Sequence, residues 1–439
     1  MTATSSPTGC CSPTAGRRPV WPSSRRWSSR SASPPDPAGG VRVANLHDFR
    51  DLSHLSYEWH LEEEGVEVAS GHLDVPPVDA GSATTVPLPP FPATARETWL
   101  TVRAVLATDH PWAPAGHEVA WGQVPVEACP THPALGKGSP QAPAAGPPLG
   151  RVTDPSQVER AVVHSPLVVG PGTFDAASGR LVRVGEIDVD GPVLDLWRGP
   201  TDNDQGHHGE ALAPVWRRVG LHRLRHRVDG VALEGDGLVA RSWVAPAATD
   251  LGVAVAYRWS VVEGGLRLEV EVVPEGDWPC PWPRLGLRMA MPAGFRNVEW
   301  SGRGPGEAYA DTGRAARVGR FAATVAELQT PYLYPQENGN RRDVRWTTVD
   351  DGGGRGIRFE GEPTFDLTVR PWTSEQLDQA RHPTDLVPGD GVWVNLDLAQ
   401  QGIGSASCGP GVLPVYRLDP APATFAVRLL PAPGGPTGS

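Results

Sequence analysis

The sequence of 439 residues is poor in cysteine and in basic side chains, and it has no long hydrophobic run. Five cysteines without a regular spacing predict neither a disulfide framework nor a zinc site. Lysine and arginine (39 together) are outnumbered by aspartate and glutamate (50), which excludes nucleic-acid binding that rests on phosphate neutralisation. No apolar run approaches the roughly 18 residues that span a bilayer. We therefore expect a soluble, cytoplasmic protein that binds neither nucleic acid nor membrane.

Glycine and proline are abundant instead, and so is tryptophan. The 51 glycines and 48 prolines make up more than a fifth of the chain, and there are sixteen tryptophans. Glycine and proline weaken the interior of helices, and aromatic side chains favour strands. This composition predicts a loop-rich, all-β protein, and the length predicts two to four domains.

Changes in composition along the chain predict its domain organisation. Residues 1–40 are rich in serine and proline and contain no Leu, Ile or Phe, which predicts a disordered tail. Alternating apolar side chains predict a small antiparallel sandwich of immunoglobulin-like size over residues 41–128. A Pro/Gly/Ala-rich linker is expected over residues 129–161. Strand signals then continue through residues 162–432, which predicts a large β-sandwich, and residues 433–439 form a second tail.

Local patterns predict individual elements of the large sandwich. Apolar residues alternate over 253–259 and 266–272 on both sides of a glycine-rich turn, which predicts a β-hairpin. Only two short helices are expected, one from a capping box at 373–376 to about Arg381 and one around residues 216–219. So few helices cannot supply the alternating strand–helix units of a (β/α)₈ barrel.

The densest polar cluster of the chain is residues 197–206, directly after an apolar run. Asp202 and Asp204 could bind a hard cation, but the later acidic ligands of a calcium loop are absent. Alternatively, the cluster is a loop whose Asp and Asn side chains form hydrogen bonds with their own backbone.

Two further segments combine polar groups with glycine or aromatic rings. Residues 301–311 contain Glu307 and Asp311, and Pro305 argues against a phosphate loop that opens a helix. This segment predicts a surface loop that presents polar groups to a neutral polyol. Residues 332–346 add aromatic rings beside amide and guanidinium groups, a mixture that suits sugars. Each cluster alone would more often be a solvated loop or an ion-pair network.

Three segments resemble, in this order, motifs of the long-chain β-galactosidases of glycoside hydrolase family 2: residues 196–206, 302–311 and 335–346. Residues 99–103 and 115–123 resemble the domain that precedes the family's last domain. The resemblance implies an all-β chain, with a small immunoglobulin-like β-sandwich followed by the large galactose-mutarotase-like β-supersandwich of the small chain. The family motif residues carried over are Arg198, Asp202, Asn203, Asp204, Glu337, Asn338 and Arg341.

The resemblance covers about residues 41–430, and these do not include the barrel on which the family carries its two catalytic glutamates. It implies that this chain has no catalytic residue, no metal site and no cofactor, since the family's magnesium and sodium sites are expected on the catalytic part. The expected function is that of a C-terminal portion or small subunit of a β-galactosidase. The expected partners are a β-galactoside, a barrel-bearing β-galactosidase chain and further subunits of an oligomer.

In this family the last domain supplies an aromatic floor and a flanking loop to the sugar site. The resemblance implies that Gly302, Arg303, Glu307, Asp311 and Cys408 contribute to substrate binding. Cys408 stands where many members carry a tryptophan, so the resemblance predicts a weaker platform for stacking. The carboxylates clustered here, Glu307 with Asp311 and Asp202 with Asp204, lie in loops that the family does not use for chemistry.

Three other interpretations of the sequence remain open. The chain could be a free-standing carbohydrate-binding sandwich or an inactive, truncated gene product. It could also be an independent mutarotase, which needs a histidine and a carboxylate facing one groove. His207, His208 and His382 are available for that role.

Overall fold

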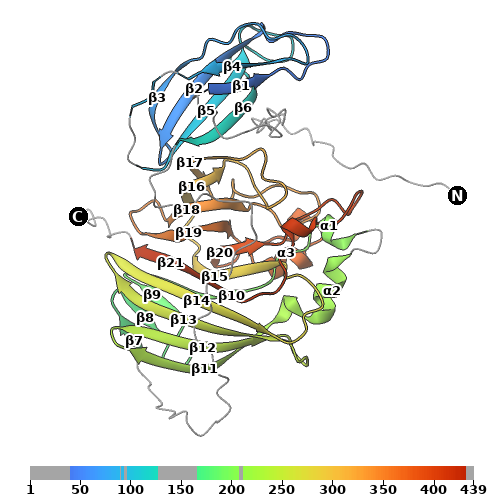
Figure 1. Cartoon of the computed structure of the whole chain (residues 1–439). Helices are drawn as coiled ribbons and strands as arrows, with labels where there is room; N and C mark the ends of the chain where they lie inside the picture. Colours follow the sequence, from blue (N-terminus) through green and yellow to red (C-terminus); the bar gives the residue numbers. More distant parts are fainter. Residues whose placement is uncertain (1–39, 89, 93–95, 127–165, 207–210, 432–439) are drawn as a thin grey trace, which may run out of the picture. The chain divides into compact units, whose positions relative to one another are not determined.

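The computed structural model describes residues 40–88, 90–92, 96–126, 166–206 and 211–431, which form two compact units. Within these ranges the units consist mainly of antiparallel strands (Figure 1), which confirms the predicted all-β fold class. The predicted linker and tails lie outside the described residues, except for Gly40, the first residue of a strand. The predicted domain bounds stay a prediction.

Residues 40–126, most of which belong to the smaller unit, form two sheets. Strands β1 (Gly40–Ala44) and β4 (Ala83–Pro87) form an antiparallel pair. The second sheet has the order β3 (Val66–His72), β2 (Leu55–Glu63), β5 (Thr98–Leu106) and β6 (Glu118–Val126). Tyr57, Trp59 and Leu61 are buried on alternate positions of β2, as the sequence pattern predicts.

The larger unit contains one sheet of fifteen strands. Its continuous path begins with β11 (Arg225–Glu234), β12 (Gly237–Ala245), β13 (Gly252–Val262), β14 (Gly265–Glu275), β21 (Ala423–Pro431) and β19 (Gly356–Arg370). The path continues through β20 (Gly391–Gln400), β15 (Arg284–Pro292), β10 (Ile187–Asp195), β9 (Leu181–Val184), β8 (Gly172–Phe174) and β7 (Leu167–Val169). A branch is formed by β18 (Arg341–Asp350), β16 (Asn297–Gly304) and β17 (Arg317–Thr324). The predicted hairpin is β13 and β14.

The large sheet curls so that its two halves face each other across an apolar core. Phe174 in β8 and Trp259 in β13 are distant along the sheet, yet their rings lie 5.1 Å apart. The backbone N–H of Leu194 in β10 donates to the Tyr257 hydroxyl in β13 at 2.9 Å. Burial against this core stabilises the sheet by the hydrophobic effect. The opposite face of β10, β15 and β20 carries polar groups, among them Asp195, Arg288 and Asn395.

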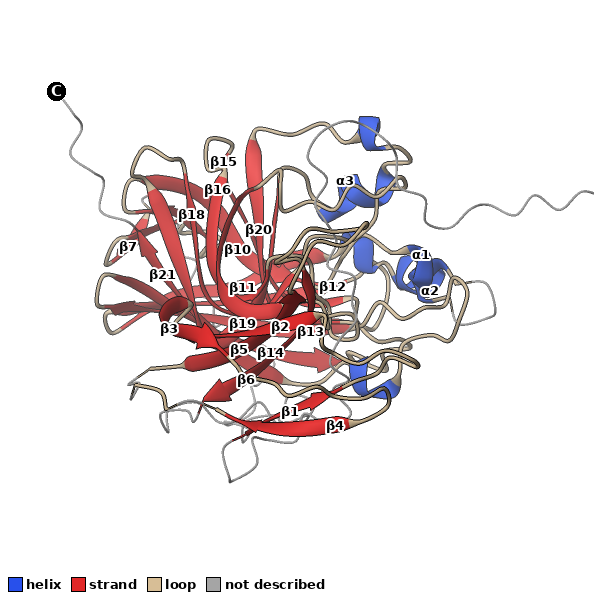
Figure 2. Ribbon diagram, turned by 90° about the horizontal axis from the view of Figure 1, so that it is seen from above, coloured by secondary structure: helices blue, strands red, loops and turns tan. Residues whose placement is uncertain are grey.

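Short helices gather at one end of the strands of the large unit (Figure 2). They are α1 (Asp202–Gln205), α2 (Leu212–Val219), α3 (Ser374–Gln379) and the 3₁₀ turns η3 (Leu221–Arg223), η4 (Pro383–Asp385) and η5 (Pro414–Tyr416). The predictions of α2 and α3 are confirmed, and α3 has the expected capping box between Thr373 and Gln376.

One local prediction is confirmed in part and another is wrong. Asp204 accepts a hydrogen bond from the nearby Thr201 N–H, as the loop interpretation predicts, but Asp202 and Asp204 lie in a short helical turn because Thr201 and Asp204 form a capping box. Gly302 and Arg303 lie in strand β16, where Gly302 packs against Val344 without space for a side chain. This position therefore needs a glycine because the strands pack closely and not because the chain turns there.

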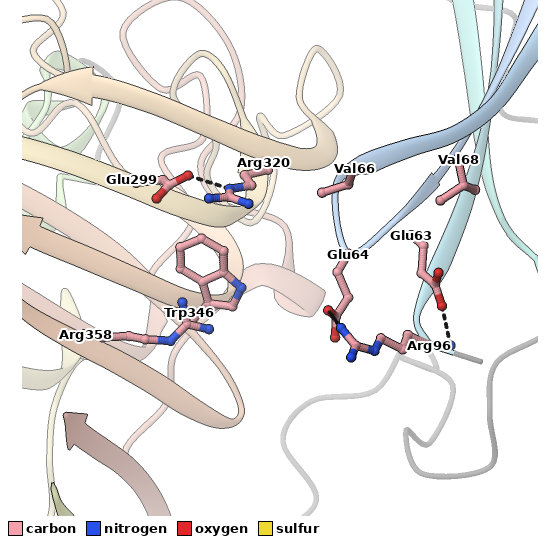
Figure 3. A pocket seen from close by; sticks show the side chains of 9 residues that line it. All are labelled: Glu63, Glu64, Val66, Val68, Arg96, Glu299, Arg320, Trp346 and Arg358. Atoms are coloured by element: carbon pink, nitrogen blue, oxygen red, sulfur yellow. Dashed lines mark hydrogen bonds and ion pairs between the residues drawn. The ribbon is translucent and has the colours of Figure 1, made fainter. Parts of the chain in front are cut away.

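In the branch, one tryptophan ring lies beside two guanidinium groups (Figure 3). The Trp346 indole has the Arg358 guanidinium 4.0 Å from its centroid and that of Arg320 at 5.5 Å. Arg320 also pairs with Glu299. Figure 3 further shows Glu64 beside Arg96, which form an ion pair of 2.8 Å. Each of these charged side chains therefore has a partner within its own segment.

Candidate functional site

Loops from three distant motifs meet beside α1 in the large unit. The Asp202 N–H donates to Gln336 Oε1 at 3.0 Å, which joins the first motif to the third. Asn203 Nδ2 donates to the Gly404 carbonyl at 2.9 Å, and Asn203 Oδ1 accepts from the Ser407 hydroxyl at 2.6 Å. We name residues 201–206, 305–311, 330–338 and 402–411 the rim. The loop after β20 lies next to α1 in Figure 1.

Asp311 connects the second motif to the same rim. Its carboxylate accepts the N–H groups of Ile403 at 3.0 Å and Gly404 at 2.7 Å. The segment that carries Cys408 is therefore held by Asp311 from one side and by Asn203 from the other. Cys408 itself is exposed, and residues 403–411 contain no aromatic side chain.

Glu307 orients an aromatic ring on the rim. Its Oε1 accepts from the Tyr332 hydroxyl at 2.6 Å, and its Oε2 accepts from the Thr330 hydroxyl and the Gly339 N–H, both at 2.8 Å. Burial and the Glu307 charge raise the pKa of Tyr332, so the hydroxyl remains a donor. Tyr332, Leu333 and Tyr334 expose 38%, 79% and 47% of their surface. The exposed aromatic groups of the rim thus come from this segment.

Two motif residues are buried, Asp204 within the rim and Arg198 just before it in the sequence. Arg198 Nη2 donates to both carboxylate oxygens of Asp204 at 3.0 Å, and Arg198 Nη1 donates to the Gln401 carbonyl at 2.6 Å. Asp204 also accepts from the Thr201 N–H at 2.8 Å. The Asp204 carboxylate is fully used by protein donors, so Asp202 and Asp204 do not fit a cation site.

Glu337 lies at the centre of the buried charges. It pairs with Arg370, and its Oε1 lies 3.5 Å from Arg284 Nη2. The Tyr309 hydroxyl donates to the same oxygen at 3.3 Å. Burial alone would raise the pKa of Glu337, but the charges of Arg370 and Arg284 outweigh it and hold that pKa below its usual value.

Arg284 shares its guanidinium among three buried carboxylates. Its Nε lies 3.0 Å from Asp397 Oδ2, and its Nη1 lies 3.5 Å from Asp195 Oδ2. The third carboxylate is Glu337. Asp195 also accepts from Asn395 Nδ2 at 3.0 Å. These charges join the polar face of the sheet to the loops that cover it, so the position of the rim depends on them.

The remaining motif residues stabilise the backbone within the rim and beside it. Arg303 pairs with Asp343 on the neighbouring strand. Asn338 Oδ1 accepts the Thr330 N–H at 3.0 Å. Arg341 is buried, donates to the Gly339 carbonyl at 2.7 Å and stacks 5.3 Å from the centroid of Trp300. The structure therefore brings Asp202, Asn203, Glu307, Asp311 and Cys408 to one rim, whereas Gly302, Arg303 and Arg341 lie in the strands beneath it.

Sequence reasoning missed Arg284, Arg370, Asp195 and Asp397. Each lies in or at the end of a strand with an apolar pattern and outside the dense polar clusters. The sequence signal that could have found them is an ionisable residue inside an apolar run. An unpaired buried charge is costly, so such a residue indicates a buried partner of opposite charge.

Within the described ranges, no three or more His, Cys, Asp or Glu side chains are grouped so that they could hold a metal ion. In the same residues, no helix is long and apolar enough to cross a membrane.

Comparison with known proteins identifies both units. A family model described as beta galactosidase small chain matches residues 172–429, and one described as beta-galactosidase, domain 4, matches residues 41–127. A beta-galactosidase of Arthrobacter sp. (strain B7) is 35% identical over 419 residues, covering 89% of this chain and 39% of that protein. A beta-galactosidase of Priestia megaterium is 30% identical over 381 residues, covering 84% of this chain and 35% of that protein.

The chain thus spans less than two fifths of the length of these relatives. A solved structure of a galactose mutarotase-like protein from Lactobacillus casei has a TM-score of 0.35 and 12% identity, covering 61% of this chain and 99% of that chain. Because the small-chain model matches more than half of the sequence, in the part that carries the rim, the chain belongs to the β-galactosidase small-chain family.

Proposed function

We propose that this chain is the C-terminal portion or small subunit of a β-galactosidase and that its rim borders the sugar site of a barrel-bearing partner chain. The observation that carries the proposal is the rim itself, on which side-chain hydrogen bonds join the three motifs to one another and to residues 402–411, up to about 200 residues away in the sequence. Its exposed tyrosines provide apolar faces, and fixed amides and carboxylates surround them. Such a surface suits the C–H faces and hydroxyls of a sugar.

The hydrogen bonds of the rim carboxylates support a role of the rim in sugar binding and not in catalysis. Retaining hydrolysis of a glycoside needs two carboxyl groups about 5–5.5 Å apart on either side of the scissile bond. Asp204 is neutralised by Arg198, Asp311 accepts two backbone N–H groups, and Glu307 accepts three hydrogen bonds. In this proposal the catalytic glutamate pair and the magnesium and sodium sites belong to the partner. The substrate is a terminal β-galactoside of the lactose type, and the assembly is a cytoplasmic oligomer.

The isolated chain is expected not to hydrolyse nitrophenyl galactoside, whereas a barrel-bearing β-galactosidase chain lacking this region is expected to gain activity when the two are mixed. The measurement is the hydrolysis rate of each chain alone and of the mixture. In the mixture, Asn203→Ala should lower the rate, because it frees the segment that carries Cys408. Asp236→Ala, in an exposed turn far along the sheet, is the control. Turnover by the isolated chain that Glu307→Gln abolishes would overthrow the proposal.

Replacing Cys408 by tryptophan is expected to lower the Michaelis constant of the reconstituted enzyme by up to about tenfold. An aromatic contact is worth roughly 0.5–1.5 kcal/mol beyond its buried area, and 1.4 kcal/mol corresponds to one decade. The turnover number should change less, because a platform binds ground state and transition state alike. Steady-state kinetics of Cys408→Trp and Cys408→Ala measure both constants. Unchanged Michaelis constants in both variants would mean that Cys408 does not border the sugar.

A further inference from the structure

Residues 331–334 of the rim form an unbroken exposed run that contains two aromatic rings. Tyr332, Leu333 and Tyr334 expose 38%, 79% and 47% of their surface, whereas the chain is buried again from Pro335 to Arg341. Single exposed apolar residues are common, but a group of them typically marks an interaction site. Because residues 403–411 contain no aromatic side chain, this run supplies the aromatic rings that the rim exposes.

The exposed run is fixed at both ends by hydrogen bonds within this chain. The Tyr332 hydroxyl donates to Glu307 Oε1 at 2.6 Å, and the Tyr332 N–H donates to the Thr330 carbonyl at 2.8 Å. At the other end, the buried Gln336 side chain donates from Nε2 to the Tyr334 carbonyl at 3.2 Å. A surface that is rigid before binding loses less conformational entropy when a ligand binds. The run therefore needs no partner chain to hold it in position.

An exposed carboxylate lies beside this run. Gln336 Oε1 accepts the Asp202 N–H at 3.0 Å, and Gln336 Nε2 donates to Asp202 Oδ2 at 3.3 Å. Asp202 itself is exposed. A carboxylate accepts at about four lone-pair sites, and among the described residues the Asp202 side chain accepts only the bond from Gln336. Its other sites are therefore available to the hydroxyls of a ligand. We name Asp202, Tyr332, Leu333 and Tyr334 the tyrosine face.

The charges of the rim select the class of ligand. Its four segments contain five acidic side chains and no basic one, so an anionic ligand would be repelled. The core of a protein–protein interface is depleted in charged residues, whereas here an exposed carboxylate adjoins the rings. A neutral sugar fits both features, because its C–H faces pack against aromatic rings and its hydroxyls donate to carboxylates.

We propose that the tyrosine face is the surface with which this chain contacts the sugar, where the rings of Tyr332 and Tyr334 pack against C–H groups and Asp202 accepts hydroxyls. This inference rests on the proposed function, since it concerns the same rim, and it adds the residues that bind the substrate there. Asn203, the residue after Asp202, bonds instead to the segment that carries Cys408. Cys408→Trp would therefore add a second aromatic contact to the one already present.

The first test measures binding of lactose to the full chain without a partner, by saturation-transfer NMR of the lactose protons. The unmodified chain should bind, and Tyr334→Ala should raise the dissociation constant about threefold to tenfold. Tyr334→Phe keeps the ring and should bind like the unmodified chain. Asp202→Asn should also weaken binding, because an amide offers one acceptor oxygen in place of two. Trp112→Ala is the matched control, because Trp112 is 63% exposed but lies between β5 and β6.

The second test measures steady-state kinetics of the full chain mixed with a barrel-bearing β-galactosidase chain that lacks this region. Tyr334→Ala should raise the Michaelis constant for lactose about threefold to tenfold. The turnover number should change less, because a stacking contact binds ground state and transition state alike. If the tyrosine only stabilised the loop, Tyr334→Ala would instead lower the amount of active complex, and hence the turnover number, at an unchanged Michaelis constant.

The two tests separate the tyrosine face from the proposed function. No lactose binding by the unmodified chain, or equal binding by Tyr334→Ala and Tyr332→Ala, would overturn the tyrosine face and leave the proposed function intact. Weaker association of Tyr334→Ala with the barrel-bearing chain at unchanged lactose binding would also overturn it, because a protein would then cover the rings. A mixture that hydrolyses no galactoside would overturn the proposed function, and lactose binding by the isolated chain would still decide the tyrosine face.

Discussion

Replacing Arg284 by methionine should lower the free energy of unfolding of the large unit by about 3–5 kcal/mol, the usual cost of breaking a buried ion pair from one side. Arg284 is fully buried, and its guanidinium lies within 3.5 Å of Asp397, Asp195 and Glu337. Methionine fills similar space but leaves three buried carboxylates short of a positive charge. Urea unfolding followed by tryptophan fluorescence measures the change, since ten of the sixteen tryptophans lie in this part of the chain.

Arg258→Met is the matched control for this experiment. Arg258 pairs with Glu271 at 3.6 Å, but its side chain is 36% exposed. Pairs of this kind contribute about 0–1 kcal/mol, so the control should unfold at nearly the same urea concentration as the unmodified chain. A similar small loss for Arg284→Met would mean that the buried charges do not hold the loops below the rim to the sheet.

The free energy of unfolding of the unmodified protein should fall as the pH rises, and replacing Asp366 by asparagine should remove this decrease. Asp366 is buried opposite Asp397 on neighbouring strands. Burial, together with the Asp343 charge and against that of Arg342, raises the pKa of Asp366 to about 7. The usual value is 3.8. The folded protein therefore keeps a proton that the unfolded chain releases, and stability falls with rising pH between about 4 and 7.

The expected difference in the free energy of unfolding between the two proteins is large, because the folded and unfolded states differ by one bound proton over several pH units. Relative to Asp366→Asn, the unmodified protein should lose about 1.4 kcal/mol per pH unit between roughly pH 4.5 and 6.5. Urea unfolding of both proteins across this range gives the difference, in which the contributions of groups that do not interact with Asp366 cancel. Asp236→Asn, in the exposed turn between β11 and β12, is the control and should follow the unmodified protein. Parallel pH profiles for the unmodified protein and Asp366→Asn would show that Asp366 is ionised in the folded state.

The sequence alone predicted the elements whose cause is local. The hairpin of β13 and β14 follows from alternating apolar residues around Gly264, and α3 follows from Thr373 and Gln376 three residues apart. The prediction of a loop at Gly302 from its local sequence was wrong. The glycine lies in a strand, and the reason for it is Val344, which packs against it from another strand. For α1, the deciding feature was again a capping box, here between Thr201 and Asp204, but the cluster of polar residues around it concealed the signal.

The sequence by itself determined the all-β class, the order of the two units and the motifs that the rim contains, because composition and alternation act over a few residues. Only the tertiary structure decided which motif residues meet. Asn203 holds Gly404 and Ser407 from 201 and 204 residues away, and Arg284 reaches Asp397 across neighbouring strands. Such contacts depend on the path of the whole sheet, which no local pattern encodes. The structure therefore joined the segment that carries Cys408 to Asp311 and Asn203 and assigned Arg198 and Arg341 to the buried support.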